Sequence, residues 1–253
     1  MNKSFSILLT AITLMSTLNG VDIIVDKEKL KEIKTKNKLL QDPVFTIKGA
    51  IEKPESYILK IVAKSARGSQ LINAILNKKT SDIYIGSAYD KEGKIISFPQ
   101  DAKTIKEGVA FSYGMGSKDI YIVTDPECPY CTKFEKAVAG KLKDYRVHMI
   151  LYPLSFHKKA PAMIEWILQG KDDAEKKERF EELMLKGSRK YTALIKDAKK
   201  PFDYNPSTQA YIAKSKQASM ELGVRGTPSI FDGTFKPLEQ GKLLKIKAKR
   251  SQK

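Results

Sequence analysis

The stretch DPECPYC at residues 125–131 contains both cysteines of this 253-residue chain. The β-rich run before it, residues 120–123, predicts a buried strand, and residues 132–138 are compatible with a helix. If the helix begins here, Cys128 is its N-cap and Pro129 its first residue, where a missing N–H costs nothing. The free amide N–H groups and the positive end of the helix dipole then face the Cys128 sulfur, and both favour thiolate over thiol.

The spacing of the two cysteines predicts redox chemistry. Cys131 lies about one helical turn after Cys128, on the same face, where it can close a disulfide with Cys128. The Cys128 thiolate can then attack a substrate disulfide, and Cys131 or a substrate thiol can resolve the mixed disulfide. The alternative of a passive structural bridge is weak, because so short a loop removes little chain entropy.

Two other site types depend on the histidines, His148 and His157. A zinc site would need two ligands besides the cysteines, and these histidines are nine residues apart, which is outside the usual ligand spacing. A Cys–His protease would also need one of them. We interpret each as a packing or surface histidine, and we predict no metal.

Residues 1–20 are typical of a signal peptide, with Lys3 before an apolar stretch at 5–18 and small or polar residues at 19–20. An uncleaved anchor is the alternative. Export would place the chain in an oxidising compartment, where a cysteine pair has redox meaning.

Composition narrows the classes of partner. Hydrophobic residues make up 42% of the chain, which is enough for a folded core. The formal net charge is +17, but the lysines are interleaved with acidic residues and no nucleic-acid motif accompanies them. We interpret the charge as a solvated basic surface and predict no nucleic-acid partner.

Hydrophobic patterns and turn residues divide the chain into segments. We predict an N-terminal α+β domain at 21–98, a linker at 99–116, a catalytic domain at 117–241 and a frayed basic tail at 242–253. Within the first domain the patterns predict a helix at 26–40, a strand at 44–51, a helix closing at Asn77, and a hairpin with strands at 82–89 and 94–98. In the catalytic domain they predict a second strand at 147–151, helices through 158–222 and a hairpin at 230–235.

The order of these features resembles the DsbC/DsbG group of periplasmic disulfide isomerases. The resemblance begins at about residue 43. It depends on Cys-Pro-Tyr-Cys after a strand, on Gly226-Thr227-Pro228 far downstream, and on a small upstream domain containing Ile85-Gly86-Ser87 and the turn at 90–93. It implies an α/β thioredoxin-like domain with a helical insertion, preceded by a small α+β (cystatin-like) dimerisation domain and a helical linker.

The resemblance also implies roles for residues around the cysteines. Pro228 would be a cis-proline packed against the redox pair, and Thr227 would offer its backbone to an extended substrate. Pro129 and Tyr130, between the cysteines, would support the site. Without the cysteines, Thr227-Pro228 would be interpreted as an ordinary turn.

Two positions near the cysteines need separate explanation. Ile122 stands where many thioredoxin-fold relatives carry an acidic residue that assists proton transfer. Glu127 adjoins Cys128 and could disfavour its thiolate, or it could complement the positive end of the helix.

The function implied is a periplasmic thiol–disulfide isomerase or reductase that acts on unfolded or mispaired secreted proteins. It would work as a homodimer, without a cofactor, and a membrane redox partner would recycle it. The Thr227-Pro228 pair favours isomerase activity. A dimeric dithiol oxidase and a redox-assisted periplasmic chaperone remain the alternatives.

Overall fold

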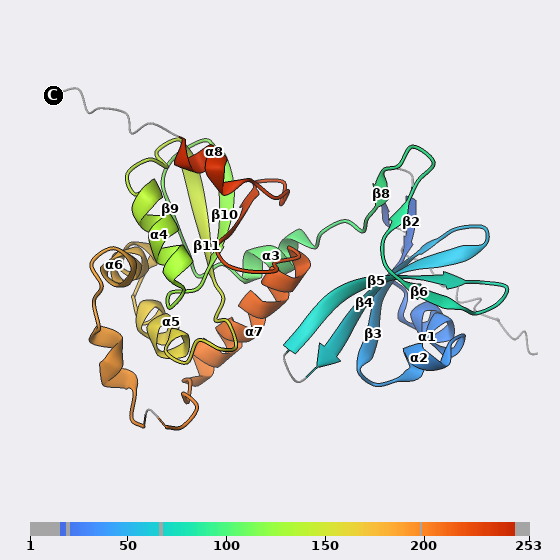
Figure 1. Ribbon diagram of the computed structural model, residues 1–253, viewed down its shortest axis with the longest axis horizontal. Coiled ribbons are helices and arrows are strands. Elements are labelled where there is room, and N and C mark those ends of the chain that lie inside the picture. The colour runs from blue at the N-terminus through green and yellow to red at the C-terminus, as the bar shows by residue number, and fades with distance from the viewer. Residues whose placement is uncertain (1–15, 19–20, 66–67, 198, 246–253) are drawn as a thin grey trace, which may run out of the picture. The chain divides into compact units, whose positions relative to one another are not determined.

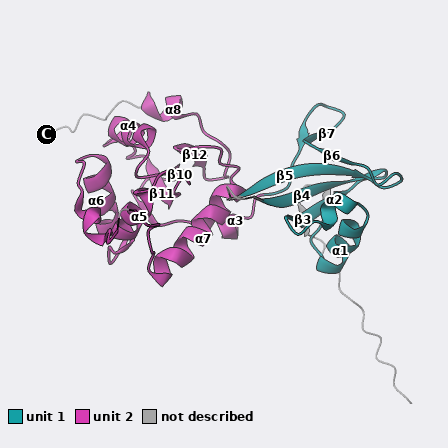
Figure 2. Cartoon of the chain, turned by 60° about the horizontal axis from the view of Figure 1, so that its bottom comes forward, with its two compact units in different colours: residues 1–99 teal, residues 100–253 magenta. Residues whose placement is uncertain are grey.

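The computed structural model describes residues 16–18, 21–65, 68–197 and 199–245 (Figure 1). The chain divides into two compact units, residues 1–99 and 100–253 (Figure 2). Of the predicted signal peptide, residues 1–20, only 16–18 are among the described residues, and they form strand β1 (Ser16–Leu18). None of the helices in the described part of the chain has the length and apolar character needed to cross a bilayer.

The first unit is built on one antiparallel sheet with the order β1-β2-β3-β4-β5-β6. Its further strands are β2 (Val21–Ile24), β3 (Phe45–Glu52), β4 (Ser56–Ser65), β5 (Gly68–Asn77) and β6 (Ile83–Ile85). Two short helices follow β2, namely α1 (Lys27–Thr35) and α2 (Lys38–Gln41). A separate hairpin pairs β7 (Ala88–Tyr89) with β8 (Ile95–Ile96).

Both faces of this sheet are covered. On one face, apolar residues of α1 and α2 pack against alternate residues of the strands, as Leu30 and Leu40 do against Leu59. On the other face, Ile58 lies in a smaller cluster with Ile96 of the β7–β8 hairpin. Because adjacent residues of a strand point to opposite faces, Ile58 and Leu59 lie in different clusters.

Three sequence predictions in this unit need correction. The hairpin strand predicted at 82–89 is two strands, because β6 pairs with β5 and only β7 pairs with β8. Residues 71–77, predicted as helix, belong to strand β5, which pairs with β4 along its whole length. The apolar residues of this segment fit both periods, and long-range pairing with β4 decides between them. The predicted helix at 26–40 is two helices, because Asn37 begins α2 by accepting a hydrogen bond from Leu39 N through its side chain.

The second unit has a four-stranded sheet with the order β12-β10-β11-β9. The central strands β10 (Lys118–Thr124) and β11 (Tyr145–Leu151) are parallel, and β9 (Phe111–Tyr113) and β12 (Ser229–Asp232) run antiparallel to them. Helix α4 (Pro129–Val138) connects β10 to β11. Between β11 and β12 lie α5 (Ala160–Leu168), α6 (Asp173–Met184), the 3-10 helix η1 (Lys190–Leu194) and α7 (Pro206–Glu221). The strand order and this helical insertion confirm the predicted α/β fold class of the domain.

Helices cover both faces of β10, so its residues alternate between two cores. Ile120 and Ile122 lie in the cluster that holds α4 and α6, whereas Tyr121 and Val123 lie in the cluster that holds α7. A strand buried on both faces reads as a continuous apolar run, which is why residues 120–123 could be predicted from the sequence.

The predicted linker and tail differ from the structure. Residues 99–116 contain helix α3 (Ala102–Glu107) and strand β9, and both are part of the second unit, since Ile105 is fully buried in the α7 cluster. The start of the predicted tail forms helix α8 (Gln240–Leu244), whose Leu243 is buried in the core, so this part is not frayed. Residues 246–253 lie outside the described residues.

Candidate active site

Cys128 lies where strand β10 gives way to helix α4. It is the N-cap of α4, with extended backbone angles and no side-chain capping bond, and Pro129 is the first helical residue, as predicted. Thr132 N donates to Cys128 O at 3.1 Å, which closes the first helical turn. The sulfur of Cys128 therefore stands at the end of α4 where backbone N–H groups have no helical acceptor.

The two cysteines are free thiols, and both are buried. Cys131 is fully buried, and Cys128 has an exposed fraction of 4%, against 74% for Tyr130 between them. Only a small part of Cys128 is therefore exposed in this structure. A substrate must approach at this exposed edge, beside Tyr130.

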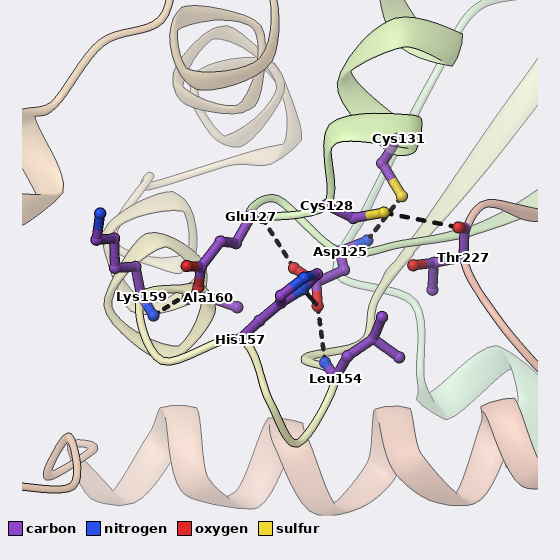
Figure 3. A network of polar contacts seen from close by, with 9 residues as sticks. All are labelled: Asp125, Glu127, Cys128, Cys131, Leu154, His157, Lys159, Ala160 and Thr227. Atoms are coloured by element: carbon purple, nitrogen blue, oxygen red, sulfur yellow. Dashed lines mark hydrogen bonds and ion pairs between the residues drawn. The ribbon is translucent and has the colours of Figure 1, made fainter.

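The predicted proline loop meets the cysteines in space. The Thr227–Pro228 peptide bond is cis, which confirms the expectation from the resemblance. The Cys128 thiol donates to Thr227 O, with 3.7 Å between sulfur and oxygen (Figure 3). Although the two residues are 99 positions apart, the pairing of β10 with β12 brings them together.

Cys131 is held as a buried neutral thiol. Burial raises its pKa to about 12, and a backbone hydrogen bond from Asp125 N, 3.5 Å from the sulfur, opposes part of this rise. The hydroxyl groups of Thr124 and Thr227 act in the same direction as this bond. Both hydroxyl oxygens are buried and make no hydrogen bond in this structure, so each has a proton that it can donate to a thiolate. Ile122 is fully buried in the apolar core.

Asp125 organises the loop before Cys128. Its side chain is fully buried, and it accepts three hydrogen bonds, from Glu127 N at 2.8 Å, Leu154 N at 2.7 Å and His157 Nδ1 at 2.8 Å (Figure 3). These bonds tie the cysteine loop to the loop that follows β11. A buried carboxylate with three donors is well satisfied, so Asp125 fixes the two loops against each other.

Sequence reasoning missed the role of His157, which was interpreted as a packing or surface residue. The signal was present, since Asp125 follows β10 and His157 follows the adjacent parallel strand β11. The carboxyl ends of adjacent parallel strands lie at the same edge of a sheet. His148 is separate from the site: it points to Ser112 Oγ at 2.8 Å and to Asp119 at 3.0 Å.

Glu127 has a different task from either one predicted. Its Oε2 accepts hydrogen bonds from Lys159 N at 2.6 Å and Ala160 N at 2.8 Å (Figure 3). Lys159, the N-cap of α5, makes no capping bond through its own side chain. The Glu127 carboxylate therefore supplies the cap of α5, and it is directed at that helix rather than at Cys128.

Within the described residues, no third His, Cys, Asp or Glu side chain joins the cysteines in an arrangement that could hold a metal ion. The geometry instead suits thiol–disulfide exchange. One sulfur belongs to the N-cap residue of a helix and donates to the Thr227 carbonyl, and a second sulfur is buried one turn later.

The comparison with protein families agrees with this fold. Residues 113–237 match the family model described as a thioredoxin-like domain. The fold of this part of the chain is thioredoxin-like. The matched part contains both cysteines and the cis-proline, and it excludes the whole of the first unit.

Solved structures show likeness to the thioredoxin-like domain at low identity. ScsC of Proteus mirabilis in a transitional conformation is 19% identical, with a TM-score of 0.43, over 57% of this chain and 77% of that one. A periplasmic thioredoxin-like protein of Salmonella enterica serovar Typhimurium is 19% identical, with a TM-score of 0.42, over 57% and 94%. A disulfide interchange protein of Neisseria gonorrhoeae is 16% identical, with a TM-score of 0.38, over 55% and 94%. A search of the curated proteins by sequence found no match.

Proposed function

We propose that the chain is a periplasmic thiol–disulfide oxidoreductase of the DsbC/DsbG type, an isomerase or reductase of mispaired secreted proteins. The observation that carries the proposal is the placement of Cys128 at the N-cap of α4, with its sulfur 3.7 Å from Thr227 O and Cys131 buried behind it. A helix N-terminus favours thiolate, and only the thiolate attacks a disulfide.

The reaction begins with a substrate disulfide at the open edge of Cys128. The Cys128 thiolate attacks one substrate sulfur, a mixed disulfide forms, and the other substrate sulfur leaves as thiolate. In isomerisation, a substrate thiolate then attacks the mixed disulfide and restores the Cys128 thiolate, so no electrons are transferred overall. In reduction, Cys131 attacks Cys128 instead. The substrate leaves as a dithiol, and two electrons and one disulfide are exchanged between the proteins.

Contacts near the sulfur support a polypeptide substrate. Thr227 offers its backbone beside the cysteine, where an extended chain could add strand-like hydrogen bonds. Tyr130 and Phe156 are exposed aromatic side chains, on α4 and on the loop just before His157. Such side chains would contact the apolar residues that a misfolded protein exposes.

We further propose that the protein is a homodimer through the first unit. Large apolar side chains are exposed there, with Tyr84 and Ile85 on the end strand β6 and Tyr89 and Ile95 on the β7–β8 hairpin. An unpaired strand edge with apolar side chains is a favourable site for pairing with a second copy. Light scattering after gel filtration tests this, with a monomer as the contrary result and Ile85→Lys as the dissociating variant.

The function is tested by refolding scrambled ribonuclease and by equilibrium with glutathione. We expect rescue of the scrambled enzyme that is lost in Cys128→Ala. A strongly oxidising potential without rescue would instead indicate a dithiol oxidase. Suppression of aggregation that is undiminished in Cys128→Ala, with no rescue by the wild type, would indicate a chaperone.

A further inference from the structure

The thioredoxin-like domain contains a cavity that the proposed redox site does not use. Its volume is about 290 Å³, and it lies among helices α4 and α6 and the end of strand β9. Its apolar lining includes Val138 and Leu142 on the α4 side and Phe180 and Leu185 on the α6 side. Pockets of this size and character hold small ligands by their apolar surface and orient them through a few polar groups.

The most deeply buried charged group in the lining of this cavity is the carboxyl of Glu135. Its side chain is 5% exposed, and its Oε1 is buried without a hydrogen-bond partner. A buried carboxyl oxygen without a donor is unfavourable and uncommon in folded proteins. Nothing in the proposed mechanism employs Glu135, although it lies one turn after Cys131 on the same helix.

The charged groups around Glu135 leave it without a cation. On α6, Lys177 pairs with Glu181 at 2.7 Å and lies over the ring of Tyr113, with 5.2 Å between its nitrogen and the ring centre. Lys143, after α4, also lines the cavity but is exposed to solvent. Burial first, and then the charge of Glu181, raise the pKa of Glu135 to about 8. The lining therefore holds two acidic and two basic groups, and neither lysine donates to the buried Oε1 of Glu135.

We propose that this cavity binds a small organic ammonium ion, with its charged group against Glu135 and its apolar body against the walls of the cavity. An ammonium group donates the hydrogen bonds that Glu135 lacks, and the bond is charge-assisted. A neutral alcohol of the same shape fills the apolar walls but forms no charge-assisted hydrogen bond with Glu135.

Binding is coupled to a proton. Near pH 7 the carboxyl of Glu135 carries a proton for most of the time, and a bound ammonium ion favours the carboxylate. Binding therefore releases about one proton per ligand near pH 7, and affinity rises as the pH increases toward 8. Glu181, Lys177, Tyr113 and Lys143 are the other titratable groups that line the cavity, and the Lys177–Glu181 pair stays intact throughout.

The test is titration calorimetry of the full chain with 2-phenylethylammonium and with 2-phenylethanol. We expect the amine to bind at least about tenfold more tightly than the alcohol, since a charge-assisted hydrogen bond is worth that much. Glu135→Gln should lose this preference. Glu178→Gln, on the exposed side of α6, should keep it.

Several results would overturn the proposal. They are no binding of the amine at millimolar concentration, equal binding of the alcohol, and full affinity in folded Glu135→Gln. If Glu135→Gln does not fold, the proposal is tested by calorimetry of the wild-type protein alone. The binding heat of the amine must then differ between phosphate and Tris buffers by the ionisation heat of about one proton. Equal heats would contradict the proposal. Neither the ligand comparison nor the buffer comparison involves the cysteines, so the result is independent of the redox activity.

Discussion

Asp125 and His157 are joined by a hydrogen bond of 2.8 Å at the edge of the sheet where the two central parallel strands end. Asp125 is fully buried, and the side chain of His157 is 15% exposed. Because the carboxylate accepts from His157 Nδ1 and from two backbone N–H groups, it joins the loop before Cys128 to the loop before α5.

The Asp125 contacts predict an order of stability losses. In Asp125→Asn, an amide NH₂ group replaces one carboxylate oxygen and faces N–H donors that have lost their acceptor. This change should lower the free energy of unfolding by about 3 kcal/mol. His157→Ala removes only one donor and should lower it by about 1–2 kcal/mol. Urea unfolding of the reduced full chain measures both. Trp166 fluorescence follows the second unit, because this is the single tryptophan of the chain. A greater loss in His157→Ala than in Asp125→Asn would contradict the assignment.

Glu127 should stabilise helix α5 from a distance. Glu127→Ala removes the acceptor for Lys159 N and Ala160 N and should lower the free energy of unfolding by about 1 kcal/mol. Glu127→Gln keeps a side-chain oxygen that can accept from both N–H groups, so it should lose less stability than Glu127→Ala. An equal loss in both variants would exclude a capping role.

The sequence was informative where the determinants are local. An apolar run followed by Cys128-Pro129 predicts a strand and a helix N-terminus, and both lie where predicted. The resemblance supplied the cis peptide before Pro228, which no local pattern would have indicated.

Long-range contacts explain what the sequence did not show. The acceptors that Glu127 and Asp125 provide serve backbone groups about thirty residues away, so no local motif marks them. Strand β5 was predicted as helix because its apolar residues fit both the helical and the strand period. Only its pairing with β4 distinguishes the two, and that contact is not visible in the local sequence. The polar segment 99–116 was interpreted as a linker, although Ile105 anchors it in the α7 core.

Thr124 should assist the resolving step of Cys131. Its buried hydroxyl favours the Cys131 thiolate, so Thr124→Val should slow the decay of the mixed disulfide about fivefold, the effect of one hydrogen bond of about 1 kcal/mol. Quenched single-turnover kinetics measure this decay, and Thr124→Ser should restore it. Thr132→Val is the matched control, because the hydroxyl of Thr132 contacts Met184 Sδ instead. Equal slowing in both variants would assign the effect to packing.

The buried thiol of Cys131 predicts how stability depends on pH. The unfolded thiol loses its proton near pH 8.5, whereas burial holds the folded pKa at about 12. Between these values the native state binds more protons, so the stability of the reduced protein falls as the pH rises. From pH 8 to pH 10 the loss from this group is about 2 kcal/mol. Urea unfolding of the wild type and of Cys131→Ser at both pH values measures the loss of stability that is due to Cys131. The same loss in both proteins would show that Cys131 is not its source.

The most direct test of the account is to identify the sulfur that substrate captures. Cys131→Ser is incubated with scrambled ribonuclease, quenched with acid and analysed by mass spectrometry. We predict a mixed disulfide at Cys128, and no adduct in the matched variant Cys128→Ser, whose remaining thiol is fully buried. Adducts on Cys131 in Cys128→Ser at a comparable rate, or none in either variant, would contradict the assignment of Cys128 as the attacking thiol.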